Sequence, residues 1–324
     1  SDLGLANPHA IQDRSMPKPR LAAAAAVSAL LAACGQDDAA ITAPGAGPVE
    51  APDADPAEAT GMVAAAHPDA VAAGVEILRA GGDAVDAAVA VQTVLGLVEP
   101  QSSGIGGGAF MVRHDAETGE TVVYDGRETA PAGVTEDLFL NAQGEPLGFV
   151  EAWRSGRSTG APGVIAMLAM AHEEHGQIAW SEAFQPAIAL AEDGFEVAPR
   201  LHNMAGRMAQ FTDMEETGAA ADYLFDDTGA PYPVGHVLTN EAYARTLRAV
   251  AEDWRNFYTG GIAGAIVGAV ARSPMPGALS EADLAAYEPA RHDALCSPYR
   301  GYSACSAPPP SSGGVAIGMI LGLL

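Results

Sequence analysis

The sequence predicts a mixed α/β (α+β) protein, and three observations carry that prediction. The run AVDAAVAVQTVLGLV at 84–98 is apolar on nearly every side, which is typical of a helix buried on all faces. Two strand-like runs, 110–113 and 121–125, flank an acidic Thr-Gly turn and predict a β-hairpin. Helical patterns then alternate with loops as far as the C-terminal residues. Because no internal repeat and no second linker interrupts them, we expect one domain from Thr60 onward.

Composition and charge limit the class of protein. With 324 residues, 48% of them hydrophobic and only 6% aromatic, the chain can bury a large core of alanine, valine and leucine. Its net charge is −25, and Lys18 is the only lysine beside 15 arginines. This balance argues against nucleic acid as a partner, because phosphate binding needs clustered cations. The acidity fits a surface adapted to high salt, and the arginine bias fits a coding preference.

The folded part opens with a strand-like run and two helices. Residues 61–66, GMVAAA, predict a strand. A helix follows with Pro68 at its first position, where proline is well tolerated, and it ends at Gly81 and Gly82. Its expected buried side carries Val71, Ala72, Val75 and Leu78. Asp83 then caps the buried helix over 84–98.

A glycine-rich run, PQSSGIGGGAFMV at 100–112, invites interpretation as a nucleotide-binding loop. Such loops follow a strand and open a helix, whereas here a helix precedes the glycines and a strand follows them. We therefore expect Ser103 to Gly108 to be structural, packing a helix against the sheet, with lining of a pocket as the alternative.

Further helices are predicted downstream by capping residues, apolar spacing and terminal glycines. They cover 163–175, 181–192, 240–251 and 260–271, and another begins at the capping box from Ser280 to Asp283. A last helix begins near Ser312, where Ser311 and Ser312 are expected to serve as capping and loop residues.

An export signal precedes the folded part. From Met16 to Cys34 the sequence has two cations and then an apolar run too short for a stable membrane span. Its end, Leu31-Ala32-Ala33-Cys34, resembles the bacterial lipobox, whose cysteine is lipidated; an ordinary signal peptide is the alternative. Because Gly35 and not aspartate follows, we expect a periplasmic lipoprotein, anchored in the outer rather than the inner membrane.

Three regions of the chain follow from these signals. Residues 1–33 comprise an upstream extension and a lipoprotein-type signal peptide. We expect the residues before Met16 not to be native translated sequence. Residues 34–59 form an acidic tether rich in proline and alanine, which cannot bury enough apolar surface to fold. Residues 60–324 form the folded domain.

The remaining cysteines and histidines have structural interpretations. Cys296 and Cys305 flank a predicted turn between two strand-like runs, and in an oxidising compartment we expect a disulfide rather than two buried thiols. His172 and His175 lie three residues apart, unlike the metal-binding H-E-x-x-H arrangement, so we predict a solvated helix face and no metal. No cofactor is expected.

A serine hydrolase is one rival function. The stretch from Gly156 to Gly160 matches G-x-S-x-G around Ser158. That motif needs a hydrophobic strand before it and a helix directly after it, and neither is indicated by the neighbouring sequence. We therefore expect Ser158 to be a loop serine.

Seven motifs, taken together and in order, resemble the γ-glutamyltranspeptidase family. They spread over the whole of 60–324. The matching stretches are GMVA at 61–64, GGDAVDAAVA at 81–90, SGIGGG at 103–108, DGRETAP at 125–131, ALAEDGF at 189–195, YRGY at 299–302 and PPPSSGG at 308–314.

The resemblance implies a fold and a mechanism. The fold is the four-layer αββα sandwich of N-terminal-nucleophile hydrolases, of which this chain supplies only the large-subunit part, incomplete at its C-terminus. The family's catalytic threonine follows the PPPSSGG stretch and is exposed by self-cleavage, so no catalytic residue is expected within this chain. The implied activity is γ-glutamyl transfer from, or hydrolysis of, glutathione and similar compounds, in partnership with a small subunit from the same precursor.

The family match also assigns roles to two residues. Arg127 corresponds to the arginine that binds the substrate carboxylate, although an arginine at a strand exit is ordinarily a surface ion-pair residue. Glu128 is expected to hold Arg127 or a neighbouring backbone in place. Alternatives are a related cephalosporin or glutaryl acylase and a non-catalytic periplasmic binding lipoprotein. We expect this polypeptide alone to be inactive and poorly soluble, because its sheet edges would be open.

Overall fold

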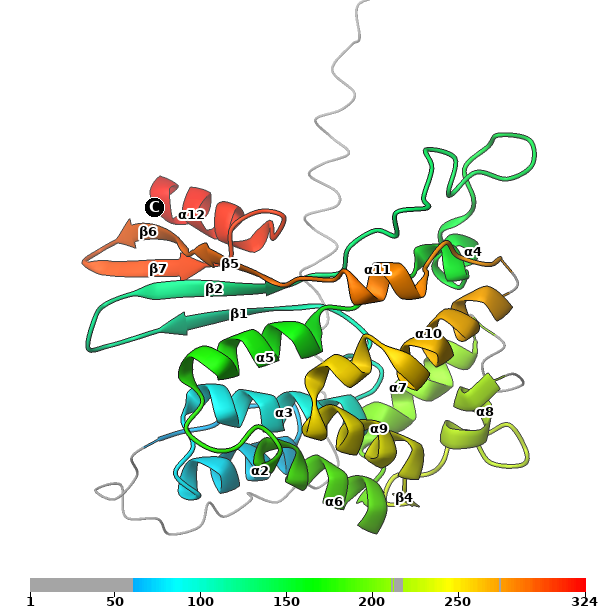
Figure 1. Ribbon diagram of the computed structural model, residues 1–324, viewed down its shortest axis with the longest axis horizontal. Coiled ribbons are helices and arrows are strands. Elements are labelled where there is room, and N and C mark those ends of the chain that lie inside the picture. Colours follow the sequence, from blue (N-terminus) through cyan, green and yellow to red (C-terminus); the bar gives the residue numbers. More distant parts are fainter. Residues whose placement is uncertain (1–60, 211, 213–217, 274) are drawn as a thin grey trace, which may run out of the picture. The chain divides into compact units, whose positions relative to one another are not determined.

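The computed structural model describes residues 61–210, 212, 218–273 and 275–324, all within one unit of the chain, Thr60–Leu324 (Figure 1). The proposed signal peptide, Cys34 and the tether lie outside the described residues.

Two packed helices follow the opening segment. Helix α2 (Pro68–Arg79) starts with proline after the N-cap His67, and α3 (Ala84–Val98) starts with a complete capping box between Asp83 and Asp86. Gly81, at φ 95°, ends α2 as predicted, because this left-handed conformation suits glycine. The buried residues of α3 lie on most of its faces, so the prediction of a buried helix is confirmed.

Two details of the prediction for this region are wrong. Residues 61–66 form no strand, since a strand needs a hydrogen-bonded partner and the described residues offer none there. The buried side of α2 is also different from the expected one; it consists of Ala70, Ala73, Gly74 and Ile77. A methyl group on Gly74 would lie 2.9 Å from Cγ2 of Val91, so small residues permit the close approach of α3.

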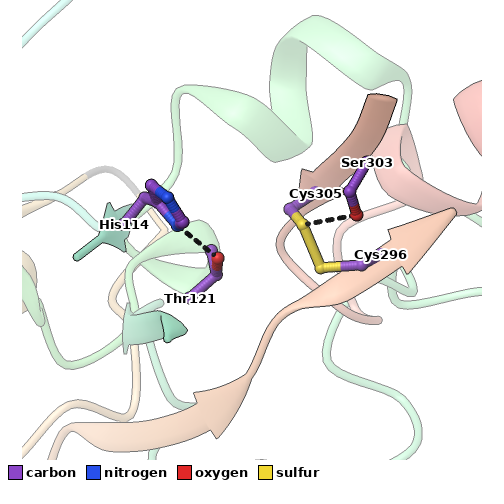
Figure 2. Close-up of a disulfide and its surroundings, with 5 residues drawn as sticks. All are labelled: His114, Thr121, Cys296, Ser303 and Cys305. Carbon is purple, nitrogen blue, oxygen red and sulfur yellow. Dashed lines mark hydrogen bonds between the residues drawn. A yellow bond between two sulfur atoms is a disulfide. The ribbon is translucent and has the colours of Figure 1, made fainter. Parts of the chain in front are cut away.

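The main sheet has three antiparallel strands in the order β1-β2-β5, formed by β1 (Ala109–His114), β2 (Thr121–Gly126) and β5 (Ala290–Asp293). The β1–β2 hairpin is confirmed, with His114 opposite Thr121 at its turn end, where the two side chains are hydrogen-bonded (Figure 2). Among the described strands only β2 is paired on both sides, and within the described residues no strand pairs with the outer edges of β1 and β5.

Helices form the layer against this sheet. Helix α5 (Val164–His175) contacts β2, and α3 contacts α2, α5 and α6 (Gln185–Asp193). Helix α6 follows the short 3-10 helix η2 (Glu182–Phe184) and contacts α9 (Glu241–Glu252). The 3-10 helix η3 (Trp254–Phe257) joins α9 to α10 (Gly260–Arg272), and α11 (Glu281–Ala285) begins with the predicted Ser280–Asp283 capping box.

In the part of the chain that the structure describes, β5 is one element that the sequence analysis did not predict. Three helices and one small sheet are also without a counterpart there. They are α4 (Phe149–Trp153), α7 (Pro199–Ala209), α8 (Gly218–Leu224) and the antiparallel pair of β3 (Phe195–Glu196) with β4 (Val237–Leu238). Pro199 at the start of α7, with Leu201 and Ala205 on its buried face, is a sequence signal that could have located that helix.

A second hairpin carries the last helix. Strands β6 (Leu295–Tyr299) and β7 (Tyr302–Ser306) place Cys296 opposite Cys305, and the two form a disulfide (Figure 2). Arg300 and Gly301 both have positive φ, as a tight two-residue hairpin turn requires. Helix α12 (Gly313–Leu323) packs on this hairpin. Its N-cap residue is Ser312, but no side chain caps it, so the expected capping bond is absent.

Helix α12 is apolar yet largely uncovered. Its exposed side chains include Met319 at 66% and Leu323 at 88% of their full exposure, together with Val315, Ile317 and Ile320. None of the helices described here combines the length and the apolar character that a membrane span requires.

Candidate functional site

Arg127 follows β2 directly, and its backbone is held on both sides. Its N–H donates to Oδ1 of Asp125 at 2.8 Å, and its carbonyl accepts from the Tyr287 hydroxyl at 2.8 Å. Burial, with the nearby charges of Asp125 and Glu128, raises the pKa of Tyr287 to about 12. The hydroxyl therefore remains a hydrogen-bond donor at neutral pH, and the position of Arg127 is set by a residue 160 positions away.

The Arg127 side chain is exposed and lines a cavity of about 580 Å³. In the part of the chain that the structure describes, its guanidinium has no hydrogen-bond or ion-pair partner. The cavity wall consists of Gly106, residues 127–131, Val134, Leu138, Phe139 and residues 157–160. An unpaired guanidinium in a cavity can accept a ligand carboxylate through two parallel hydrogen bonds.

Glu128 lies against the glycine loop rather than against Arg127. A methyl group on Gly108 would lie 2.6 Å from Oε2 of Glu128, so only glycine leaves room for this carboxylate. The described residues contain no ion pair between Glu128 and Arg127. The role of Glu128 in holding a neighbouring backbone in place therefore stays a prediction.

The glycine loop has a structural role and also borders the cavity. The Gly107 carbonyl accepts from the N–H groups of Gly163 and Val164 at 3.0 and 3.2 Å, which ties the loop to the start of α5. Gly106 lines the cavity beside Arg127. The loop leads into β1 rather than into a helix, which agrees with the expectation that it is not a nucleotide-binding loop.

Backbone contacts hold the part of the cavity wall around Thr129 and Gly160. Thr129 and Ala161 exchange two backbone hydrogen bonds of 3.2 and 2.9 Å, and a methyl group on Gly160 would lie 2.7 Å from the Thr129 carbonyl oxygen. Ala132 donates its N–H to Asp283 of α11 at 2.8 Å. These contacts fix the loop that follows Arg127 between two elements distant in sequence.

Ser158 lies in this wall, in the 3-10 helix η1 (Gly156–Ser158), but it is not arranged as a nucleophile. Its hydroxyl donates to the carbonyls of Trp153 and Ser155, both at 2.9 Å. A short helix, α4, precedes it instead of a strand. The G-x-S-x-G match therefore lacks the strand that a serine hydrolase requires, as expected.

Residues 156–160 also contain Arg157, a residue of the cavity wall that the sequence analysis did not identify. Its Nη1 donates to the carbonyls of Leu138 and Leu140 at 3.0 and 3.2 Å. The sequence offers one signal for it, a cation in a glycine-flanked turn of an acidic chain, but the G-x-S-x-G pattern directs attention to the serine instead.

The two histidines of α5 make specific structural contacts, which corrects their interpretation as a solvated face. His172 Nε2 lies 3.2 Å from Oδ1 of the fully buried Asp86, and His175 Nε2 lies 2.7 Å from the Tyr124 hydroxyl. Both rings are held by core residues because the helix face toward α3 and β2 includes them. Within the described ranges, no cluster of three or more histidine, cysteine, aspartate or glutamate side chains could hold a metal.

Comparison with known proteins gives one consistent result. A family model described as gamma-glutamyltranspeptidase matches residues 70–324. The glutathione hydrolase proenzyme of Bacillus subtilis (strain 168) is 36% identical over 265 residues, 82% of this chain and 44% of that protein. The glutathione hydrolase proenzyme of Escherichia coli (strain K12) is 37% identical over 266 residues, 82% of this chain and 45% of that protein. This chain thus spans less than half the length of these relatives.

The fold agrees with the sequence comparison. The crystal structure of Helicobacter pylori gamma-glutamyltranspeptidase superposes with a TM-score of 0.77 and 31% identity, covering 82% of this chain and 74% of that one. The expected N-terminal-nucleophile hydrolase fold is therefore confirmed for the part present here. This chain therefore belongs to the γ-glutamyltranspeptidase family, and the cavity lined by Arg127 and the glycine loop is part of a member of that family.

Proposed function

We propose that this chain is the large-subunit part of an enzyme that transfers γ-glutamyl groups from glutathione and other γ-glutamyl compounds, or hydrolyses them. The observation that supports this best is the unpaired Arg127 guanidinium in a cavity, in a chain with a net charge of −25. A γ-glutamyl donor carries a free α-carboxylate, and a guanidinium is the side chain that matches a carboxylate with two parallel hydrogen bonds.

The proposed nucleophile is an N-terminal threonine on a small subunit released from the same precursor, outside this sequence. The name proenzyme carried by the B. subtilis and E. coli relatives supports this proposal, as does the fraction of each that this chain matches. The threonine's own α-amine would take the proton of its hydroxyl, which attacks the γ-carbonyl and releases the amine part of the donor. Water or an amino acid then resolves the glutamyl-enzyme.

In this scheme the role of Arg127 is to position the donor. It would hold the α-carboxylate, and the donor's fixed length would place the γ-carbonyl at the threonine. The hydrogen bonds of Asp125 and Tyr287 to the Arg127 backbone limit where the guanidinium can lie. Glu128, which packs on Gly108, would help to hold the end of β2 and the glycine loop in fixed positions relative to each other.

The exposed apolar side chains of α12 support a partner subunit. A soluble monomer rarely leaves a contiguous apolar patch of this kind uncovered. We propose that the small subunit covers it and adds to the open sheet edges, so that this polypeptide alone is inactive and poorly soluble.

The test replaces Arg127 in the protein expressed from its natural gene. Hydrogen bonds to a charged group contribute about 1.5–3 kcal/mol, so Arg127→Gln should raise the KM for glutathione about 10- to 100-fold, and Arg127→Lys should raise it less. Arg245→Gln is the matched control, because Arg245 is 68% exposed and pairs with Glu241 of its own helix. An unchanged KM for Arg127→Gln would contradict the proposal. Preference for a glutaryl donor over a γ-glutamyl donor would favour the acylase.

We further propose that Cys34 is lipidated and that the protein is periplasmic and anchored in the outer membrane. The lipobox-like Leu31-Ala32-Ala33-Cys34 and the tether after it support this. Metabolic labelling with a fatty-acid probe should mark the protein but not its Cys34→Ser variant. Equal labelling of the two would refute the anchor.

A further inference from the structure

A second guanidinium lines the cavity that contains Arg127. Arg157 reaches it from η1, whereas Arg127 reaches it from the exit of β2. Glu128 is the one acidic residue of that wall, and its carboxylate lies against Gly108. Among the described residues, the cavity wall therefore carries more positive than negative charge, although the chain as a whole is strongly acidic.

The backbone beside Arg157 is hydrogen-bonded and closely packed. The N–H of Gly156 donates to the Met275 carbonyl at 2.9 Å and lies 2.8 Å from the Ser273 hydroxyl oxygen. A methyl group on Gly156 would lie 2.8 Å from the backbone nitrogen of Gly277, so η1 is packed directly on the segment after α10. A guanidinium based here loses less conformational freedom on binding than one on a free loop.

The guanidinium of Arg157 is only partly used by the protein. It has five N–H donors, and the described contacts, to Leu138 and Leu140, involve Nη1 alone. The nearby Asp137 does not pair with it within the described structure. The Asp137 carboxylate accepts a hydrogen bond from the Thr135 hydroxyl. That bond is the main cause of the lowered pKa of Asp137; a hydrogen bond from its own backbone N–H comes next, and the Arg157 charge contributes least. The donors on Nη2 and Nε remain available to a ligand.

We infer that Arg157 forms a second anion subsite, which binds a carboxylate on the leaving-group side of the donor. This inference rests on the proposed function and specifies the substrate class: γ-glutamyl peptides that end in a free carboxylate, with glutathione as the example. The cavity of about 580 Å³ lies within the range of about 300–1,000 Å³ typical of small-molecule sites. Arg127 takes the α-carboxylate of the glutamyl group, and Arg157 takes the carboxylate at the other end.

The alternative arrangement has both arginines on a single carboxylate. In that case every γ-glutamyl donor would depend on Arg157 to the same degree. In the proposed arrangement only donors with a leaving-group carboxylate depend on it, so the two arrangements differ in substrate discrimination.

The experiment compares glutathione with its glycine monoethyl ester, which has nearly the same size but lacks the second carboxylate. The protein expressed from its natural gene should have a KM about tenfold lower for glutathione than for the ester, because a charge-assisted contact is lost in the ester. Arg157→Gln should abolish this discrimination, and Arg157→Lys should retain part of it. A general disturbance of the loop would instead change both KM values by the same factor.

Three outcomes separate the possibilities. Loss of discrimination in Arg157→Gln supports the second subsite. The subsite is refuted if Arg157→Gln changes both KM values by the same factor, or if Arg157→Gln still discriminates between glutathione and the ester. In either case, γ-glutamyl turnover by the wild type would still support the proposed function. No turnover of either donor, nor of γ-glutamyl-p-nitroanilide, by the wild type would overturn the proposed function and the subsite with it.

Discussion

Replacing Gly163 with alanine tests how closely the strand exit at Arg127 is packed. Gly163 has a φ of −119°, which alanine also adopts, so the substitution causes no backbone strain of the left-handed kind. The added methyl group would nevertheless lie 2.6 Å from the carbonyl carbon of Gly126, and closer still to its oxygen and to the Tyr287 hydroxyl. Ordinary carbon contacts lie at about 3.5–4.0 Å, so these groups must move by about 1 Å.

The cost can be estimated from these contacts. Overpacking of this kind destabilises a protein by about 1–3 kcal/mol. Displacing Tyr287 also breaks its hydrogen bond to the Arg127 carbonyl, which contributes about 1 kcal/mol. The sum is about 2–4 kcal/mol, equivalent to a decrease of roughly 5–15 °C in Tm for a protein of this size. Because Arg127 follows Gly126 directly, the KM for glutathione should rise as well.

Thermal unfolding and steady-state kinetics measure both effects, with Gly261→Ala as the matched control. Gly261 lies in α10, and a methyl group added to it would meet no atom within 4 Å beyond its own helix backbone, so alanine there should be neutral or slightly stabilising. If Gly163→Ala melts within about 2 °C of Gly261→Ala and binds glutathione normally, the packing argument for the position of Arg127 is wrong.

Two further predictions concern the disulfide of the β6–β7 hairpin and the contact of Asp283 with the loop after Arg127. Replacing both Cys296 and Cys305 with serine removes a disulfide whose cysteines are 9 positions apart in the sequence. Because the unfolded chain is then less constrained, the free energy of unfolding should fall by about 2.5 kcal/mol. An unchanged urea midpoint would contradict this. The Ala132 N–H and the Ser280 hydroxyl lower the pKa of Asp283 from its ordinary 3.8. Because its folded-state pKa is the lower one, Asp283 stabilises the fold above about pH 4 and loses that effect as pH falls through its lowered pKa. Asp283→Asn should therefore flatten the pH dependence of Tm below about pH 4, and an unaltered profile would count against the contact.

The elements that could be predicted are those whose signals are local. Asp83 and Ser280 cap helices within three residues of themselves, and the acidic turn before Thr121 joins two adjacent strands. The interactions that make these elements lie within a short window of the sequence, so composition and spacing are sufficient to find them.

Errors arise where a distant partner decides the structure. Residues 61–66 have strand composition, but a strand forms only with a hydrogen-bonded neighbour, and none is present among the described residues. Apolar spacing assigns the buried side of α2 to Val71, Ala72, Val75 and Leu78, whereas the residues that are buried are Ala70, Ala73, Gly74 and Ile77. At Gly74 the absence of a side chain leaves room for Val91 of α3, a contact that the spacing within α2 does not record. The polar neighbours of His172 in the sequence predict a solvated ring, although the buried Asp86 lies 3.2 Å from it.

By itself, the sequence determined the acidic character of the chain, the buried helix over 84–98 and, through its ordered motifs, Arg127 as the residue to examine. Only the tertiary structure decided that Arg127 and Arg157 line one cavity and that Tyr287 and Asp283 hold its walls. The physical reason is that these contacts join residues up to 160 positions apart. Such contacts form only when sheet, helices and loops are packed together, and no local pattern records which distant side chain will meet another.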